Sequence, residues 1–262
     1  MLTLGLDPSL SSYGWCVYDG SKTGLDKVVE RGRWKTPASQ IEVARYITLR
    51  ESLRECVRKY DIKRAAAETP PIGPTGDWSQ EKLYALFIVN MEVMYTEGVD
   101  IVLFAPTQLH LYAKQWGSQV VKGEWFKSDM QSTAQLDVLD LLHHPRNGDY
   151  WDNSPSKRKR LREAGWKKHP RPIVDVMDYP KDVRKSLRFQ SDEADAYLAA
   201  SCGHRFWEHL LGRIPEADLT PSEWDIFAKT HTYTRGKKAG LTDRDGIIFK
   251  EGSRFYRFAT AA

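Results

Sequence analysis

The sequence predicts an α/β protein built on a mixed five-stranded sheet that is flanked by helices. Two observations support this fold class. Near the N-terminus, three short apolar runs separated by tight turns predict an antiparallel meander. After them, stripes of apolar residues at three- and four-residue spacing alternate with two further short apolar runs. The resulting order, three strands and then helix, strand, helix, strand, is that of an α/β layer architecture with parallel strands following the meander.

The meander should begin with a strand over Leu2 to Leu6 that ends at Asp7. A turn rich in Pro and Ser follows, and an apolar, aromatic pattern resumes over Tyr13 to Tyr18 as the second strand. The third strand, Lys27 to Trp34, mixes Val and Trp with charged residues, so we expect it to be partly exposed. Asp7 is therefore predicted to lie at the end of a buried strand.

The next elements complete the predicted sheet. A helix should begin near Ser39, a plausible cap, and present the apolar stripe Tyr46, Leu49, Leu53, Val57 and Tyr60. Lys63 to Glu68 is a candidate fourth strand, although its alanines could also extend the preceding helix. Ser79 to Tyr95 is a strongly apolar helix, and Asp100 to Phe104 is the fifth strand.

Later elements are separated by long stretches of weak periodicity. We expect further helices at Lys127 to His143, at Ser191 to about Leu211 with Ser191 as cap, and at Pro221 to Lys229 after a cap at Thr220. A short strand is possible at Ile173 to Met177, and Gly246 to Lys250 should pair with Arg254 to Phe258 as a hairpin.

Composition limits the class of protein. A length of 262 residues with 41% hydrophobic and 28% charged content is enough for one sizeable core. No apolar run approaches the ~20 residues that span a bilayer, and no signal-like segment opens the chain, so we expect a soluble protein of the cytoplasm. Cys16, Cys56 and Cys202 lack the spacing of a zinc site or redox pair.

Positive charge is concentrated in one stretch. Trp151 to Pro172 holds eight Lys or Arg against two acids, a local net charge of +6. Such a run is often a solvated face, but Trp151 and Trp166 lie within it, which favours a nucleic acid whose bases can stack. The predicted phosphate contacts are Lys157, Arg158, Lys159, Arg160, Arg162, Lys167 and Lys168.

Four carboxylates lie at the ends of predicted buried elements. Asp7 and Glu68 each end a strand, and Asp192 and Asp195 are three residues apart, on one face of the first turn of a helix. A buried carboxylate is costly without a metal, a cation or hydrogen-bond donors. Two structural explanations remain open, since Asp7 could cap its own turn and the helix acids could complement the helix dipole.

The motifs around these acids resemble the RuvC-type branch of the RNase H-like nucleases. The matching residues are Leu4-Gly5-Leu6-Asp7-Pro8-Ser9 with Gly14, Glu68 after an alanine-rich strand, Ala105-Pro106-Thr107, and Asp192-Glu193-Ala194-Asp195-Ala196. They are spread over roughly residues 1–143 and 190–212. The resemblance implies an RNase H-like sheet with three antiparallel strands followed by parallel strands.

The resemblance also implies an activity, that of a Holliday-junction resolvase. Such a protein is a metal-dependent, structure-selective endonuclease that acts on branched double-stranded DNA as a homodimer. Two Mg²⁺ ions would assist phosphodiester hydrolysis, and Mn²⁺ is expected to substitute for them. By the resemblance, Asp7 would bridge both ions, with Glu68, Asp192 and Asp195 completing the ligand set. The helix from Leu83 to Tyr95 is the first candidate for the dimer interface, its alternative role being core.

Basic residues near the reacting phosphate follow from the same resemblance. Lys127 matches the lysine that family members place at the start of a helix, although it could equally be an exposed lysine, and Lys122 is a weaker candidate. Where relatives carry a lysine three residues after the Pro-Thr motif, this chain has His110, which we expect to be a packed core residue. Relatives often carry, after the glutamate of the fourth strand, an aromatic residue that helps to open the junction centre. Here Thr69-Pro70-Pro71-Ile72-Gly73 follows Glu68, so the role is unassigned, with Trp78 as a speculative substitute.

Two segments have no counterpart in compact family members. We expect residues 1–212 to form the nuclease domain, interrupted by a basic insertion at about 144–190. Residues 213–262 would form a basic extension made of a helix and a hairpin. These additions mark a divergent relative, of the kind expected in a phage or mobile element and therefore in the cytoplasm of a bacterial or phage-infected cell.

Two other functions fit part of the pattern. Actin- and sugar-kinase-like phosphotransferases also begin with a strand that carries Gly-x-Asp and a Ser/Thr-rich turn, but this chain is short for two such domains and has no second glycine-rich phosphate loop. A non-catalytic protein of the same fold that binds branched DNA is the other alternative. The full set of acids argues against it, since buried carboxylates are costly to keep.

Overall fold

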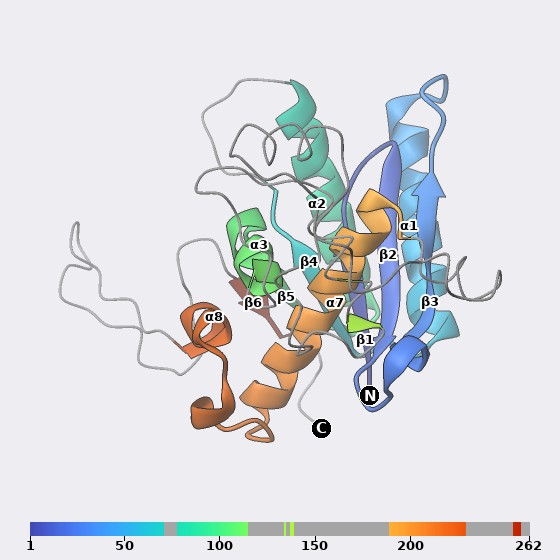
Figure 1. Ribbon diagram of the computed structural model, residues 1–262. Coiled ribbons are helices and arrows are strands. Elements are labelled where there is room, and N and C mark those ends of the chain that lie inside the picture. Colours follow the sequence, from blue (N-terminus) through green and yellow to red (C-terminus); the bar gives the residue numbers. More distant parts are fainter. Residues whose placement is uncertain (71–77, 115–133, 135–136, 139–188, 229–253, 258–262) are drawn as a thin grey trace, which may run out of the picture.

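The computed structural model describes residues 1–70, 78–114, 134, 137–138, 189–228 and 254–257 (Figure 1). A six-stranded mixed sheet with the order β3-β2-β1-β4-β5-β6 forms its centre. The strands are β1 (Leu2–Asp7), β2 (Ser12–Asp19), β3 (Val28–Lys35), β4 (Arg64–Glu68), β5 (Asp100–Phe104) and β6 (Arg254–Tyr256). The predicted fold class, a mixed sheet flanked by helices, is confirmed.

Strand direction follows the prediction for the first five strands. β1, β2 and β3 form an antiparallel meander, whereas β4 pairs in parallel with both β1 and β5. The prediction of five strands was one short, because β6 adds an antiparallel strand beside β5. β6 lies within the predicted C-terminal hairpin, but its predicted partner strand lies outside the described residues.

Helices cover both faces of the sheet (Figure 1). α1 (Glu42–Lys59) and α2 (Trp78–Thr96) pack on one face, where Leu4, Leu6 and Leu53 belong to one apolar cluster. α3 (Pro106–Lys114) and α7 (Ser191–Leu210) pack on the other face. Shorter turns are η1 (Gly24–Lys27), η4 (Glu216–Asp218), α8 (Pro221–Glu223) and the π-helical turn η5 (Trp224–Ala228). Alternation along β1 explains the two clusters, since successive strand residues point to opposite faces.

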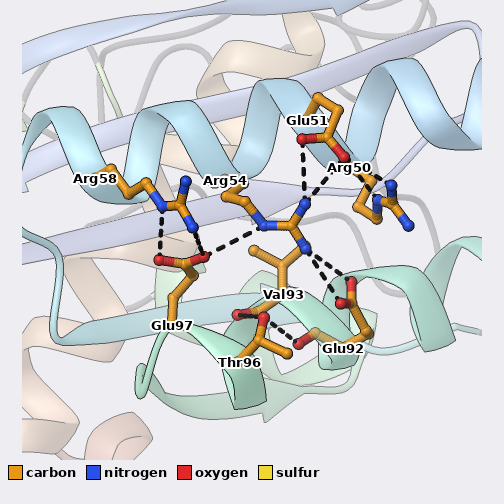
Figure 2. Close-up of polar contacts among 8 residues, drawn as sticks. All are labelled: Arg50, Glu51, Arg54, Arg58, Glu92, Val93, Thr96 and Glu97. Carbon is orange, nitrogen blue, oxygen red and sulfur yellow. Dashed lines mark hydrogen bonds and ion pairs between the residues drawn. The ribbon is translucent and has the colours of Figure 1, made fainter.

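An ion-pair cluster joins the two helices of the first face. Figure 2 shows Arg54 of α1 between Glu92 of α2 and Glu97, the residue after α2, with N···O distances of 3.1 and 3.2 Å. Arg58 donates two hydrogen bonds to Glu97, at 2.9 and 2.8 Å. The first turns of the helices are also joined, because Lys82 pairs with Glu42 at 3.0 Å. These ion pairs join α1 and α2 near both ends, so the two helices lie side by side.

Helix α7 approaches the sheet closely because small residues line their contact. A Cβ at Gly5 would stand 2.0 Å from the carbonyl oxygen of Ala196, and one at Gly203 would stand 2.3 Å from the Ala66 Cβ. Both distances are far below van der Waals contact. The glycines thus fix how deeply α7 sits on β1 and β4, and this docking positions its first turn.

Two predicted caps were wrong and one was confirmed. α1 begins at Glu42 after Ile41, not near Ser39. The N-cap of α7 is Gln190 rather than Ser191, and the Gln190 amide donates to Glu193 Oε2 at 3.1 Å. Thr220 caps α8 as predicted, since its hydroxyl accepts from the Glu223 amide at 3.2 Å. Sequence reasoning did not foresee α3, which begins directly after β5 at Pro106.

Several predicted elements lie outside the described residues. They are the loop after Pro70, most of Lys127 to His143, the strand at Ile173 to Met177 and the strand at Gly246 to Lys250. The domain boundary at residue 212 stays a prediction. In the part of the chain that is described, no helix has the length and apolar character needed to cross a membrane.

Candidate metal and nucleic-acid site

Asp7 and Glu68 lie at neighbouring ends of two parallel strands. The β1–β4 register pairs Leu6 with Ala67, so each acid is the next residue at the carboxyl end of its strand. Both acids are half-buried and line one cavity of about 80 Å³, together with Pro8, Thr69, Pro70, Leu83 and Phe87. This volume exceeds the ~10–15 Å³ that a single water needs. The structure therefore brings the two predicted strand acids to one solvent-accessible hollow.

Asp192 reaches the same end of the sheet from α7. Asp7 is paired with Gly14 of β2, and a Cβ on Gly14 would stand 2.1 Å from the Asp192 carbonyl oxygen. The Asp192 carboxylate accepts a 2.5 Å hydrogen bond from the Ser12 hydroxyl. The first turn of α7 thus lies over the rung that holds Asp7, while the Asp192 side chain is turned toward β2.

Asp195 lies one helical turn beyond Asp192. Its side chain is half-buried between the buried Ala194 and Ala196, and the Ala196 backbone lies on Gly5, two residues before Asp7. Residues three apart in a helix share a face, so Asp192 and Asp195 leave the same side of the first turn. The first turn of α7, which carries both acids, therefore lies against β1 and β2 near the end of β1.

These acids fit a divalent ion as a pair rather than as a preformed cage. Within the described residues, no three His, Cys, Asp or Glu side chains are grouped closely enough to hold one metal ion. Mg²⁺, however, is commonly held by one or two carboxylates, with waters and substrate phosphates as its remaining ligands. The Asp7–Glu68 pair beside its cavity meets that requirement. The participation of Asp192 and Asp195 stays a prediction.

A buried phenol lies near Asp7. Tyr13 is fully buried, and burial, followed by the nearby Asp7 carboxylate, raises the pKa of its hydroxyl well above the usual value. Tyr13 therefore stays protonated at any pH at which the protein would act. A neutral neighbour adds no further negative charge beside Asp7, so the site can still attract a cation.

Two arginines beside the first turn of α7 were missed by sequence reasoning. Arg31 and Arg33 of β3 both approach Glu193, each with an N···O distance of 3.8 Å. Alternation in a strand places residues two apart on one face, which could have indicated a shared partner. Their partner could not be identified from the sequence, because it lies about 160 positions away on another element.

A second polar cluster was also missed. Asp137 is buried, and it accepts hydrogen bonds from Lys27 Nζ at 2.9 Å and from the Tyr197 hydroxyl at 2.6 Å. Burial, and then the charge of Asp137, raises the pKa of Tyr197 well above its usual value. The cluster borders a cavity of about 650 Å³ whose other lining residues include His204 and Arg205. The sequence could have indicated this cluster, because Asp137 lies between Leu136 and Val138 within a helical apolar pattern.

The cluster is internally balanced in charge. Lys27 neutralises Asp137, and Arg205 donates two 2.8 Å hydrogen bonds to the fully buried Glu223. Arg213 in turn pairs with Glu208 at 3.0 Å. Since each of these cations already has an acidic partner, the cluster ties η1 and α7 to neighbouring segments.

The predicted nucleic-acid contacts lie outside the described residues. They are Lys122, Lys127, Lys157, Arg158, Lys159, Arg160, Arg162, Lys167 and Lys168. Each of these assignments stays a prediction. His110, by contrast, lies in α3 and is half-buried, beside the buried Leu109.

Comparison with known proteins shows a likeness of fold. No family model matches the chain, and no curated protein matches it. Among solved structures, the chain is similar to RuvC of Thermus thermophilus in complex with a Holliday junction substrate, with 15% identity and a TM-score of 0.49 over 80% of this chain and 96% of that one. A second structure, of Thermus thermophilus RuvC, gives 15% identity and a TM-score of 0.47 with the same coverage. At these values neither structure assigns a role to any residue of this chain.

Proposed function

We propose that this chain is a magnesium-dependent, structure-selective DNA endonuclease that resolves four-way (Holliday) junctions or other branched DNA. The observation that carries the proposal is the position of Asp7 and Glu68, which lie at adjacent strand ends and line one cavity. Asp192 on the first turn of α7 lies beside the same rung, against Gly14. Carboxylates on rigid elements at one sheet edge suit a hard divalent cation.

In the proposed site, Asp7 and Glu68 would hold Mg²⁺, and Asp192 and Asp195 would contribute to a second position. Bound ions would supply an activated water and neutralise charge on the attacking and leaving oxygens. The Ser12 hydroxyl donates to Asp192 and thereby orients that carboxylate. Tyr13, kept protonated by its burial, adds no negative charge near Asp7.

The proposed partner is branched double-stranded DNA. The basic run at Trp151 to Pro172 supports a polyanionic partner by its charge, and its two tryptophans support contact with unstacked bases. Phosphate contacts from such a run carry no sequence information in themselves. Selectivity would then come from the shape of the DNA.

We further propose a homodimer formed through α2. Leu86, Val93 and Met94 of this helix are buried in the core, whereas Ile88 is 64% and Tyr95 69% exposed. With Tyr84, these exposed residues recur at four- and seven-residue spacing and so form one apolar stripe. A two-fold dimer would bring two equivalent sites to the two strands that a symmetric junction cut requires.

The proposal is tested by Asp7→Asn on labelled four-way, flapped and linear DNA. We expect Mg²⁺-dependent nicking by the wild-type protein and none by the variant, because an amide holds a divalent ion far more weakly than a carboxylate. Junction binding, measured with EDTA present, should survive. Asp19→Asn is the matched control, since Asp19 lies at the opposite end of β2, where it accepts hydrogen bonds from Ser21.

Each alternative gives a distinct result in the same assays. Cleavage that persists in Asp7→Asn would exclude the proposed site. A wild-type protein that binds junctions but never nicks them would be a non-catalytic binder of this fold. Binding of ATP without binding of DNA would favour the phosphotransferase alternative.

A further inference from the structure

Arg33 lies on the same rung of the sheet as Asp7. The β1–β2 register pairs Asp7 with Gly14, and the β2–β3 register pairs Gly14 with Arg33. Arg33 approaches Glu193 and therefore leaves the sheet toward α7, whereas Asp7, at the end of β1, lines the cavity that Leu83 and Phe87 of α2 also border. Two interstrand spacings separate the backbones of Asp7 and Arg33 by roughly 10 Å.

The first turn of α7 lies over the middle of this rung. Gly14, the middle residue of the rung, is covered by the Asp192 backbone. The next residue, Glu193, directs one carboxylate oxygen toward Arg31 and the other toward Arg33. The Glu193 carboxylate is therefore shared by two guanidinium groups beside the candidate metal site.

The two arginines differ in how firmly they are held. The Arg31 side chain is only 12% exposed, and its guanidinium lies 3.5 Å from the centre of the Phe189 ring. The Arg33 side chain is 27% exposed, and within the described residues its recorded polar contact is the ion pair to Glu193, which at 3.8 Å is too long for a hydrogen bond. Arg33 therefore presents hydrogen-bond donors at the surface.

A structural role alone explains Arg31 better than Arg33. Glu193 already accepts from the Gln190 amide at 3.1 Å, through the same oxygen that faces Arg31. A partly exposed ion pair without a hydrogen bond contributes little to stability. A guanidinium so placed is well suited to a phosphate, which it can bind through two parallel hydrogen bonds.

We propose that Arg33 binds a backbone phosphate of the DNA strand that crosses the end of the sheet at which Asp7 lies. The inference rests on the proposed nuclease function and adds a binding residue outside the basic run. It gives strand β3 of the sheet a role in holding DNA next to the site of cleavage. Arg31 and Glu193 serve as positioning residues for the Arg33 guanidinium.

The test measures junction binding against salt concentration, with EDTA present so that no cleavage occurs. Arg33→Gln should lower the slope of log affinity against log salt by about 0.9, the value for one lost phosphate contact on duplex DNA. Arg33→Lys should restore the slope, because the charge is kept. Lys63→Gln is the matched control, since Lys63 is an exposed cation that lies just before β4, at the opposite end of the sheet.

The possible outcomes separate this inference from the proposed function. If Arg33→Gln keeps the wild-type slope of log affinity against log salt, the inference is overturned. This holds even if the variant cleaves poorly, because Arg33 would then act only through Glu193. A slope that falls equally in Lys63→Gln would also overturn it, since the effect would be one of net charge. If the wild-type protein binds no junction at all, the proposed function itself fails.

Discussion

Gly14 lies directly against the backbone of Asp192. A Cβ at Gly14 would stand 2.1 Å from the Asp192 carbonyl oxygen and 2.6 Å from its carbonyl carbon. Because these are backbone atoms, the contact cannot be relieved by a rotamer change. The absence of a side chain at this one position of β2 therefore sets how close the first turn of α7 comes to the rung that holds Asp7.

The variant Gly14→Ala should push the first turn of α7 away from the sheet. We expect the free energy of unfolding to fall by about 1–3 kcal/mol, the usual cost of overpacking. Junction cleavage should be lost more completely than stability, because Asp192 moves with the helix. Gly32→Ala is the control, since its nearest neighbour is the side chain of Trp15 at 3.2 Å. Equal effects of the two variants would show that the Gly14 contact has no special role.

The hydrogen bond from Ser12 to Asp192 should orient that carboxylate. Ser12→Ala removes the donor, and we expect cleavage to fall by about 10–100-fold, as is usual for residues that orient metal ligands. The Mg²⁺ concentration at half-maximal rate should rise. Ser12→Thr keeps a hydroxyl and should retain most activity. An unchanged Mg²⁺ dependence in Ser12→Ala would separate Asp192 from metal binding.

The apolar stripe on α2 predicts a defined change in assembly. Ile88→Glu places a charge in the proposed interface, so sedimentation should show a monomer where the wild-type protein forms a dimer. The fold should persist, because Ile88 is exposed in the single chain. Val29→Glu is the control, since Val29 is an exposed residue of β3. A wild-type monomer at all concentrations, also with junction DNA, would contradict the α2 interface.

The cluster in Figure 2 predicts a loss of stability in acid. Hydrogen bonds from Arg58 hold the pKa of Glu97 below its usual value. A carboxylate whose pKa is lower in the folded state stabilises the fold fully above its unfolded pKa of about 4.3, and this contribution is lost as the pH falls below that value.

Glu97→Gln should therefore be less stable than the wild-type protein at pH 7, and the difference should shrink toward pH 3. The measurement is denaturant-induced unfolding at several pH values. Glu55→Gln removes a carboxylate at an exposed position of α1 and is the matched control for the change of net charge. A constant difference between Glu97→Gln and wild type across this range would show that the charge of Glu97 does not stabilise the contact.

Local patterns were sufficient to predict most of the described elements. β5 and β4 end within one residue of the predicted limits, because short apolar runs bounded by charges and turns identify buried strands. Cap residues were harder. The sequence pattern favoured Ser191, but the capping residue is Gln190, since the backbone at the start of α7 is set by how the helix docks on Gly5 and Gly14.

By itself, the sequence determined that Asp7 and Glu68 each lie at the end of a buried element, because strand periodicity and turn residues are local properties. The parallel pairing that makes β1 and β4 neighbours was decided by the tertiary structure. Only the tertiary structure decided that Ser12 would hold Asp192, 180 residues away, and that Lys27 would neutralise the buried Asp137, 110 residues away. These pairings depend on strand register and on the depth at which α7 packs against glycines. Neither quantity is encoded in any single stretch of sequence, since both result from the closest packing that the assembled elements allow.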